Sequence, residues 1–174
     1  MKNPSNNFTG VFFMKIKKLY SEIFLVEKKF NKNNIYYYLK TPNNASIIAK
    51  YKNKFLVVSQ KRIPINKTIF EFPGGIIEKN ISSKNTAINE LYEETGYKCI
   101  NSPKKLLSIY PDPGRLSSQF VFYFSDKIKK INKPEKGINL HLLSKTQILK
   151  LINNQKFSHA SHAYAFLSYL NKKN

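Results

Sequence analysis

Three glutamates lie within five positions of one another in a chain that has only 10 acidic residues among 174. They are Glu90, Glu93 and Glu94. Positions i, i+3 and i+4 share one face of a helix, so a helix would bring the three carboxylates together. Like charges on one turn repel, and anions near a helix C-terminus oppose the helix dipole. Hard divalent cations such as Mg2+ would remove both costs, and the alternative is a solvated acidic face.

A helix is predicted around these glutamates from the signals at its two ends. Ser82 or Ser83 can cap its N-terminus, and Gly96 stands where a C-cap glycine belongs. Ala87 and Leu91 recur between them at helical spacing.

The rest of the chain predicts strands separated by turn signals, followed by two helices. A Ser144 cap begins one helix that reaches Ile152, a Ser158 cap begins another that reaches Leu170, and a basic loop precedes both. These elements predict an α+β fold in a single domain over residues 15 to 174, with residues 1 to 14 a disordered extension. The expected strands are residues 19 to 30 and 35 to 39, which form a hairpin, then 45 to 50, 55 to 59, 106 to 110, 120 to 124 and 138 to 143, and the basic loop is 127 to 137.

The segment from Gly75 to Tyr97 resembles the Nudix box, G-x5-E-x7-R-E-U-x-E-E-x-G-U, in which U is a bulky aliphatic residue. The run E-L-Y-E-E-T-G that begins at Glu90 matches every fixed place from that glutamate to the second glycine. Two fixed places differ, since Ile81 replaces a glutamate and Asn89 replaces the arginine. The resemblance implies an α/β/α sandwich with a mixed β-sheet and a central metal-binding helix.

The resemblance also implies roles for individual residues. In the Nudix family the box glutamates and a backbone carbonyl just before the box glycine hold metal ions. Carried over, Glu90 and Glu94 are the expected direct ligands, Glu93 is a further ligand, and the Gly74 carbonyl is another. The ion would be Mg2+, with Mn2+ as the alternative, and it would help to form the attacking hydroxide. Glu135, the only carboxylate of the basic loop, is the expected general base, with Glu93 as the alternative.

Residues outside the box resemble the ADP-ribose pyrophosphatase subfamily, in which a proline lies sixteen residues past the box. Pro113 has this position here, and it stands in a Y-P-x-P-G loop. Arg62 ends a Q-x-R motif and would hold a diphosphate, Glu71 would contact substrate or metal, and Arg115 would face the phosphates or the terminal ribose. The alternatives are a plain proline turn for Pro113, a strand-end carboxylate for Glu71 and a surface residue for Arg115.

The predicted function is Mg2+-dependent hydrolysis of the pyrophosphate bond of a nucleoside diphosphate sugar, with ADP-ribose giving AMP and ribose 5-phosphate. One alternative substrate is a nucleoside triphosphate or a capped RNA end. A second alternative is a non-catalytic nucleotide-sugar-binding module, which Ile81 and Asn89 support.

Composition restricts the partners and the location. The net charge of +20 would attract polyanions, but the lysines are scattered and no nucleic-acid-binding motif is present, so nucleic acid is not the expected partner. No segment approaches the roughly 20 apolar residues of a membrane helix. Cys99 is the only cysteine, which predicts a reducing compartment and a cytoplasmic location.

Two further expectations concern structure rather than chemistry. His159 and His162 are three positions apart, but no carboxylate or cysteine accompanies them in the sequence, so a structural or surface role is expected. The resemblance implies a homodimer built through the N-terminal strands between Leu19 and Leu39.

Overall fold

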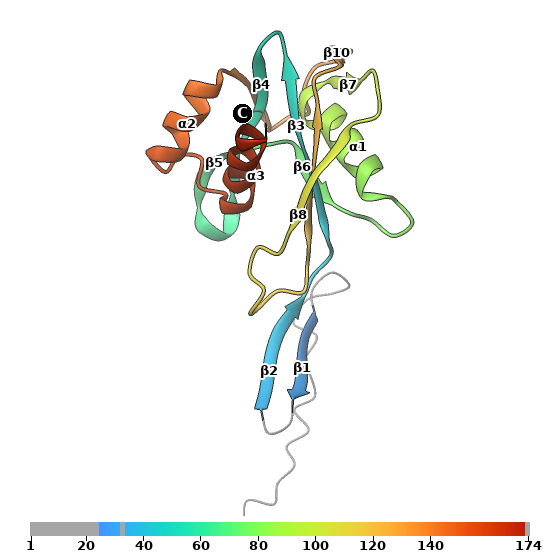
Figure 1. Cartoon of the computed structure of the whole chain (residues 1–174), viewed down its shortest axis with the longest axis vertical. Coiled ribbons are helices and arrows are strands. Elements are labelled where there is room, and N and C mark those ends of the chain that lie inside the picture. The colour runs from blue at the N-terminus through green and yellow to red at the C-terminus, as the bar shows by residue number, and fades with distance from the viewer. Residues whose placement is uncertain (1–24, 32–33, 173–174) are drawn as a thin grey trace, which may run out of the picture.

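The computed structural model describes residues 25 to 31 and 34 to 172 (Figure 1). The predicted disordered extension, residues 1 to 14, and the first part of the first predicted strand lie outside the described residues. A helix long and apolar enough to cross a membrane is not found in the part of the chain that the structure describes.

A mixed sheet of seven strands forms the centre of the protein. The pair β3–β9 is parallel and the other pairs are antiparallel, which confirms the predicted mixed sheet. Its path runs β11 (Asn139–Leu143), β4 (Lys54–Arg62), β3 (Asn44–Tyr51), β9 (Phe120–Ser125) and β8 (Lys104–Ile109), while β5 (Lys67–Glu71) pairs with β4 and β6 (Gly74–Ile76) pairs with β3.

Helices lie on both sides of this sheet, as Figure 1 shows. Helix α1 (Ser83–Thr95) lies on one side, and α2 (Lys145–Asn153) and α3 (Ala160–Asn171) lie on the other. Each side has its own apolar cluster. Leu91 of α1 packs with Ile47 and Leu56, and Phe166 of α3 packs with Phe72 and Phe122.

One edge of β3 pairs with two different strands. Its end, Lys50 and Tyr51, pairs with β4, whereas its beginning, Asn44 to Ser46, pairs with β6. The turn between β5 and β6 is held against the middle of β3, because Ile47 N–H donates to Pro73 O at 2.9 Å. This arrangement places the glycines of β6 directly under α1, and α1 contacts both β3 and β6.

Both predicted ends of α1 are confirmed. Ser82 is the N-cap, and its side chain accepts a hydrogen bond from Asn85 N–H at 3.2 Å. Gly96 is the C-cap in the left-handed conformation, with φ of 75°, a region that favours glycine. The caps therefore set the position of every glutamate on this helix.

The predicted N-terminal hairpin is also confirmed. Strand β1 (Leu25–Asn31) pairs antiparallel with β2 (Asn34–Lys40), and the hairpin extends away from the rest of the protein in Figure 1. It is joined to the body at Leu39, whose N–H donates to Arg115 O at 2.7 Å and whose carbonyl accepts from Ser117 N–H at 3.0 Å.

Two predictions about the C-terminal half are wrong. Helix α3 begins at Ala160 with His159 as its N-cap, because the chain before it is held by Phe157, which is 2% exposed and packs against Phe72. The predicted basic loop contains the strand β10 (Ile128–Lys130), which pairs with β7 (Tyr97–Cys99) and buries Ile128.

Candidate active site

Helix α1 exposes its three glutamates to different degrees. Glu94 is 6% exposed, Glu90 is half-buried and Glu93 is exposed. Glu94 connects the helix to two strands, since its Oε2 accepts from Gly74 N–H at 3.0 Å and its Oε1 from Gln60 Nε2 at 3.5 Å. The predicted shared face is therefore present, and its innermost carboxylate is fixed by hydrogen bonds.

Both glycines of β6 pack closely against neighbouring groups. A Cβ atom on Gly75 would lie 2.0 Å from Glu90 Oε1, and a Cβ on Gly74 would lie 2.0 Å from Ser46 Oγ. Any side chain at Gly75 would thus displace the Glu90 carboxylate. The backbone before the helix therefore approaches the carboxylates closely, and the metal-binding role of the Gly74 carbonyl stays a prediction.

Burial and neighbouring carboxylates raise the pKa of two glutamates on α1, Glu94 and Glu90. Burial raises the pKa of Glu94 to about 8, with the charges of Glu90 and Glu71 adding to the rise and the Gly74 N–H opposing it. Burial also raises the pKa of Glu90, followed by the charges of Glu93, Glu135 and Glu78. A divalent cation would offset this repulsion, and these oxygen ligands are the type that Mg2+ prefers.

Glu135 comes to the same helix although it lies 41 positions past Glu94 in the chain. Its backbone N–H donates to Glu93 O at 3.0 Å. The preceding loop also binds the end of α1, because Ile131 and Asn132 both donate to Gly96 O, at 2.8 and 3.0 Å. The structure therefore brings the predicted general base next to the predicted metal ligands.

A small cavity of about 130 Å3 lies beside the outer side of α1. Three carboxylates line it, from Glu78, Glu90 and Glu93. The sequence reasoning missed Glu78, which follows Gly75 by three positions. Its signal was present, since Glu78 is one of few acidic residues in a lysine-rich chain and lies inside the box.

Arg62 and Glu71 form an ion pair on the other side of Glu94. Arg62 Nη2 lies 2.7 Å from Glu71 Oε1, and the side chains are 42% and 2% exposed respectively. Neither oxygen of Glu71 accepts a hydrogen bond of regular geometry from the described residues. Arg62 keeps part of its guanidinium open to solvent, while Glu71 is enclosed.

No carboxylate is near His159 and His162 in the sequence, but Glu71 lies next to them in the folded protein. One ligand atom from each of the three residues lies within 4.8 Å of the others. The sequence could not show this, because Glu71 is on β5 and the histidines are at the start of α3.

The hydrogen bonding of His162 favours a structural role over a metal centre at these three residues. Its Nδ1 accepts from Phe72 N–H at 3.0 Å, which places the proton of the neutral ring on Nε2 and leaves no lone pair there for a metal. Burial lowers the pKa of His159, with the charge of Glu71 opposing this and that of Arg62 adding to it. Burial also lowers the pKa of His162, followed by the charges of His159 and Arg62. The expected structural role is thus supported for His162, which is 4% exposed.

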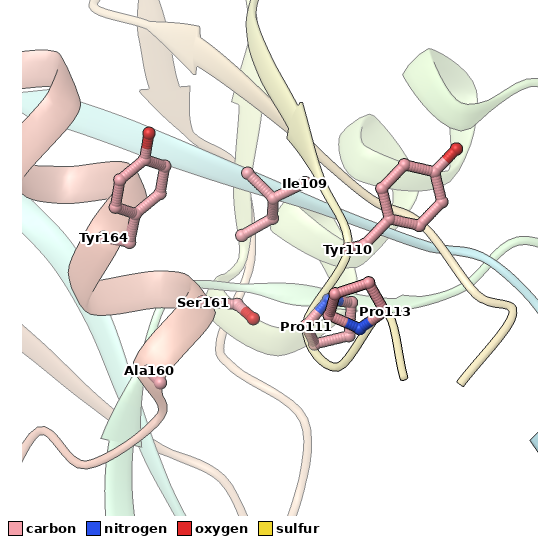
Figure 2. Close-up of a pocket in the computed structure, with 7 residues that line it drawn as sticks. All are labelled: Ile109, Tyr110, Pro111, Pro113, Ala160, Ser161 and Tyr164. Atoms are coloured by element: carbon pink, nitrogen blue, oxygen red, sulfur yellow. The ribbon is translucent and has the colours of Figure 1, made fainter. Parts of the chain in front are cut away.

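A larger cavity of about 490 Å3 lies at the predicted substrate loop (Figure 2). Tyr164 and Ser161 of α3 lie on one side of it, and the loop with Pro111 and Pro113 lies on the other, below Tyr110. Most of its lining is apolar or aromatic, and none of its lining residues is charged. Pro113 therefore borders a cavity, as a substrate-contacting residue would.

Arg115 lies in the same loop but does not line this cavity. It is exposed, and its backbone carbonyl joins the loop to the N-terminal hairpin.

Comparison with known families identifies the arrangement. A family model described as the NUDIX domain matches residues 40 to 162. The chain belongs to the Nudix family. Among its relatives is the ADP-ribose pyrophosphatase of Bacillus subtilis (strain 168), which is 28% identical over 170 residues, covering 94% of this chain and 89% of that protein.

Other relatives of this Nudix chain match less of it. The methanol dehydrogenase activator of Bacillus methanolicus is 34% identical over 93 residues, which are 53% of this chain and 50% of that protein. A solved structure titled "Crystal structure of ADP compounds hydrolase" has a TM-score of 0.74 at 16% identity, covering 87% of each chain, and so shares the fold. The predicted family, fold class and enzyme class, a Nudix pyrophosphohydrolase, are confirmed.

The two departures from the Nudix box are neighbours in space. Ile81 and Asn89 both line the cavity that holds Glu78, Glu90 and Glu93. The Nudix box has a glutamate and an arginine at these two places. The chain has replaced both, so that neither partner of a charged pair remains alone.

Proposed function

We propose that this Nudix hydrolase cleaves the pyrophosphate bond of a nucleoside diphosphate sugar in a reaction that depends on Mg2+, or alternatively on Mn2+. The observation that carries the proposal is the convergence of Glu90, Glu93, Glu94 and Glu135 on one helix beside Gly74. This set combines candidate metal ligands with a candidate base, which is the combination that hydrolysis of a diphosphate requires.

In this proposal Glu90, Glu94 and the Gly74 carbonyl hold the ion, and Glu93 completes its surroundings. When bound, the ion supplies polarisation of the diphosphate and a more acidic water. Glu135 accepts the proton of the attacking water, and Glu93, whose backbone carbonyl Glu135 binds, is the alternative acceptor.

Arg62 is proposed to hold the diphosphate. Its guanidinium uses one nitrogen for Glu71, and the exposed part of the side chain leaves further donors for phosphate oxygens. Glu71 then acts by orienting Arg62, because its own oxygens are enclosed and out of contact with solvent.

We propose that the cavity at Pro113 holds a part of the substrate that lies beyond the diphosphate. Ala160 and Ser161, which line it, directly follow His159 in the chain, and a ring nitrogen of His159 lies within 4.8 Å of a Glu71 oxygen, so this side of the cavity is near the Arg62–Glu71 pair. Tyr110 and Tyr164 are 58% and 56% exposed and offer aromatic faces to a flat ring. Arg115 remains a prediction as a contact for the phosphates or the terminal ribose.

ADP-ribose is the substrate we favour, because of the place of Pro113 and because the Bacillus subtilis ADP-ribose pyrophosphatase aligns with 94% of this chain at 28% identity. One alternative is a nucleoside triphosphate or capped RNA as the substrate. The other is that the protein is a non-catalytic nucleotide-sugar-binding module.

We also propose a homodimer, since an isolated two-stranded hairpin such as β1–β2 is marginal in water and a second copy would cover it. The cytoplasmic location stays a prediction from the single cysteine.

The test is release of AMP from ADP-ribose with and without Mg2+, beside the variant Glu94→Gln. We expect turnover that needs Mg2+ and that falls roughly a thousandfold in the variant, since metal stabilisation is worth several kcal/mol. A folded protein that binds ADP-ribose but leaves it and other nucleotides intact would contradict the proposal and favour the binding module.

A further inference from the structure

One end of the protein, at the top of Figure 1, gathers lysines that are scattered along the sequence. It consists of residues 50–54, 97–104 and 124–130, which form the turn between β3 and β4, the β7–β10 strand pair and the segments next to that pair. We call it the basic end, because these residues include eight lysines and one acidic residue, Asp126. None of the eight lysines forms a salt bridge with another residue that the structure describes. Their charge is therefore open to a partner.

Two contacts hold the parts of the basic end together. The rings of Tyr51 in β3 and Tyr97 in β7 meet edge to face, with their centroids 5.3 Å apart. Ile100 N–H donates to Lys127 O at 2.7 Å, which joins the segment after β7 to the turn before β10. The segments that carry the lysines are thus fixed next to one another, although they lie far apart in the chain.

The β7–β10 pair places two like charges opposite each other. Lys98 and Lys129 are direct partners in its register, and both are exposed. Side chains in this relation lie on one face with Cβ atoms about 4.5–5.5 Å apart, and like charges there destabilise the pair. The Lys98 ammonium lies 4.7 Å from the centre of the Tyr92 ring, which offsets only part of the cost. An anion bound over both lysines would remove the repulsion.

A cavity of about 520 Å3 lies beside this strand pair. Its volume is within the range of about 300–1,000 Å3 that is typical of ligand pockets. Its lining includes two ammonium groups, a carboxylate, an amide, a hydroxyl and an aromatic ring, from Lys104, Lys127, Asp126, Asn101, Ser102 and Phe124. The cavity therefore offers a ligand positive charge, hydrogen-bonding groups and apolar surface at once.

This cavity is separate from the one at Pro113. The two cavities lie at opposite ends of β8, since Lys104 begins the strand and lines one of them, while Ile109 ends it and lines the other. A strand rises about 3.4 Å per residue, so the ends of β8 lie roughly 17 Å apart. The cavity at the basic end is thus outside the candidate active site.

We propose that the basic end binds single-stranded nucleic acid, with backbone phosphates on the lysines of the β7–β10 pair and a base in the cavity. A positive surface that follows the backbone, next to a site that takes an unstacked base, is how proteins bind single strands. Asn101, Ser102 and Asp126 supply donors and acceptors for the edge of the base. The inference goes beyond the proposed function, because the basic end takes no part in the hydrolysis.

Two other occupants fit this end less well. A second copy of the chain that packed through the same end would bring its own lysines against these, because such an interface is self-complementary. An anionic bilayer would attract the lysines, but its surface would leave the hydrogen-bonding groups inside the cavity without partners. A single strand satisfies both the lysines and the cavity.

The test measures binding of a fluorescent single-stranded RNA of about 12 nucleotides to the full-length protein by anisotropy, with a chelator present to prevent hydrolysis. The double variant Lys127→Glu, Lys129→Glu removes one cation from the cavity and one from the strand pair. It places a carboxylate opposite Lys98, so the strand pair is expected to form. Lys145→Glu, Lys150→Glu on α2 is the matched control, because both lysines are exposed and the net charge changes equally.

We expect Lys127→Glu, Lys129→Glu to bind the RNA at least tenfold more weakly than the control variant. The slope of log affinity against log salt concentration should also fall by roughly one. Equal losses in the two charge variants would overturn the proposal, because the net charge would then explain the binding. Binding to vesicles of phosphatidylserine and phosphatidylcholine without binding to the RNA would also overturn it.

A second variant tests the cavity without changing the charge. Ser102→Leu adds an apolar side chain to the lining, and Ser102 is exposed, so the fold should tolerate it. We expect weaker binding of the single-stranded RNA and unchanged binding of inorganic polyphosphate, which has no bases. An equal effect on both ligands, or on neither, would refute a base in the cavity. These measurements need no turnover, so they hold whether or not the protein hydrolyses ADP-ribose.

Discussion

Glu94 and Glu71 are both almost fully buried, at 6% and 1% exposure, but they have opposite electrostatic surroundings. Glu94 lies beside Glu90 and accepts two hydrogen bonds from neutral donors. Glu71 lies against the guanidinium of Arg62 and beside two histidines. The cluster of Glu71, Arg62, His159 and His162, called the Glu71 cluster below, contains its own cation in Arg62, whereas the cation of the α1 carboxylates is, in the proposed function, a metal ion from solution. Glu71 therefore positions Arg62, whereas the carboxylates of α1 form a candidate metal centre.

The largest expected effect on stability comes from replacing His162, a member of the Glu71 cluster. His162→Ala should lower the free energy of unfolding by about 3 kcal/mol, because it leaves a cavity and removes the acceptor of Phe72 N–H. His162→Asn should lose less, since its amide oxygen can accept that hydrogen bond. Urea unfolding of both variants measures the difference. Equal losses would mean that the hydrogen bond contributes little.

A smaller effect on the free energy of unfolding should follow when the Glu71 cluster loses Arg62. Arg62→Ala leaves Glu71 buried without a counter-charge and should destabilise the fold by about 1–2 kcal/mol, which is less than for a fully buried pair because Arg62 is partly exposed. The double variant Arg62→Ala, Glu71→Gln should recover part of the loss, and Arg115→Ala is the control for removing an exposed arginine. No recovery in the double variant would show that Arg62 acts through packing alone.

The smallest effect is a pH dependence of the metal-free protein that comes from Glu94. Its folded pKa of about 8 is above its ordinary value of 4.5, so between these values the unfolded chain releases a proton that the folded chain keeps. Stability is therefore lost as pH rises, by roughly 1 kcal/mol between about pH 7 and about pH 8.5.

Urea unfolding with a chelator present measures this slope. Glu94→Gln should flatten it, and Mg2+ should flatten it in the wild type. A slope unchanged in Glu94→Gln would assign it to other groups. The histidines do not interfere in this range, because their folded pKa values lie below 6.5 and their effect is a loss of stability as pH falls below that value.

Much of the local structure follows from short stretches of sequence. Ser82 and Gly96 predicted the ends of α1, and apolar stretches separated by turn signals predicted most long strands. The short strands β6, β7 and β10 were not predicted, because three residues carry too little pattern and form a strand only when a partner pairs with them.

The sequence by itself determined the chemistry of α1, because helical spacing alone brings Glu90, Glu93 and Glu94 to one face. It also determined the family, because the box is contiguous. Only the tertiary structure decided which carboxylate is buried, that Glu135 joins the helix, and that Glu71 meets two histidines 88 and 91 positions away. These relations depend on strand pairing and helix packing across long separations, which no local spacing encodes.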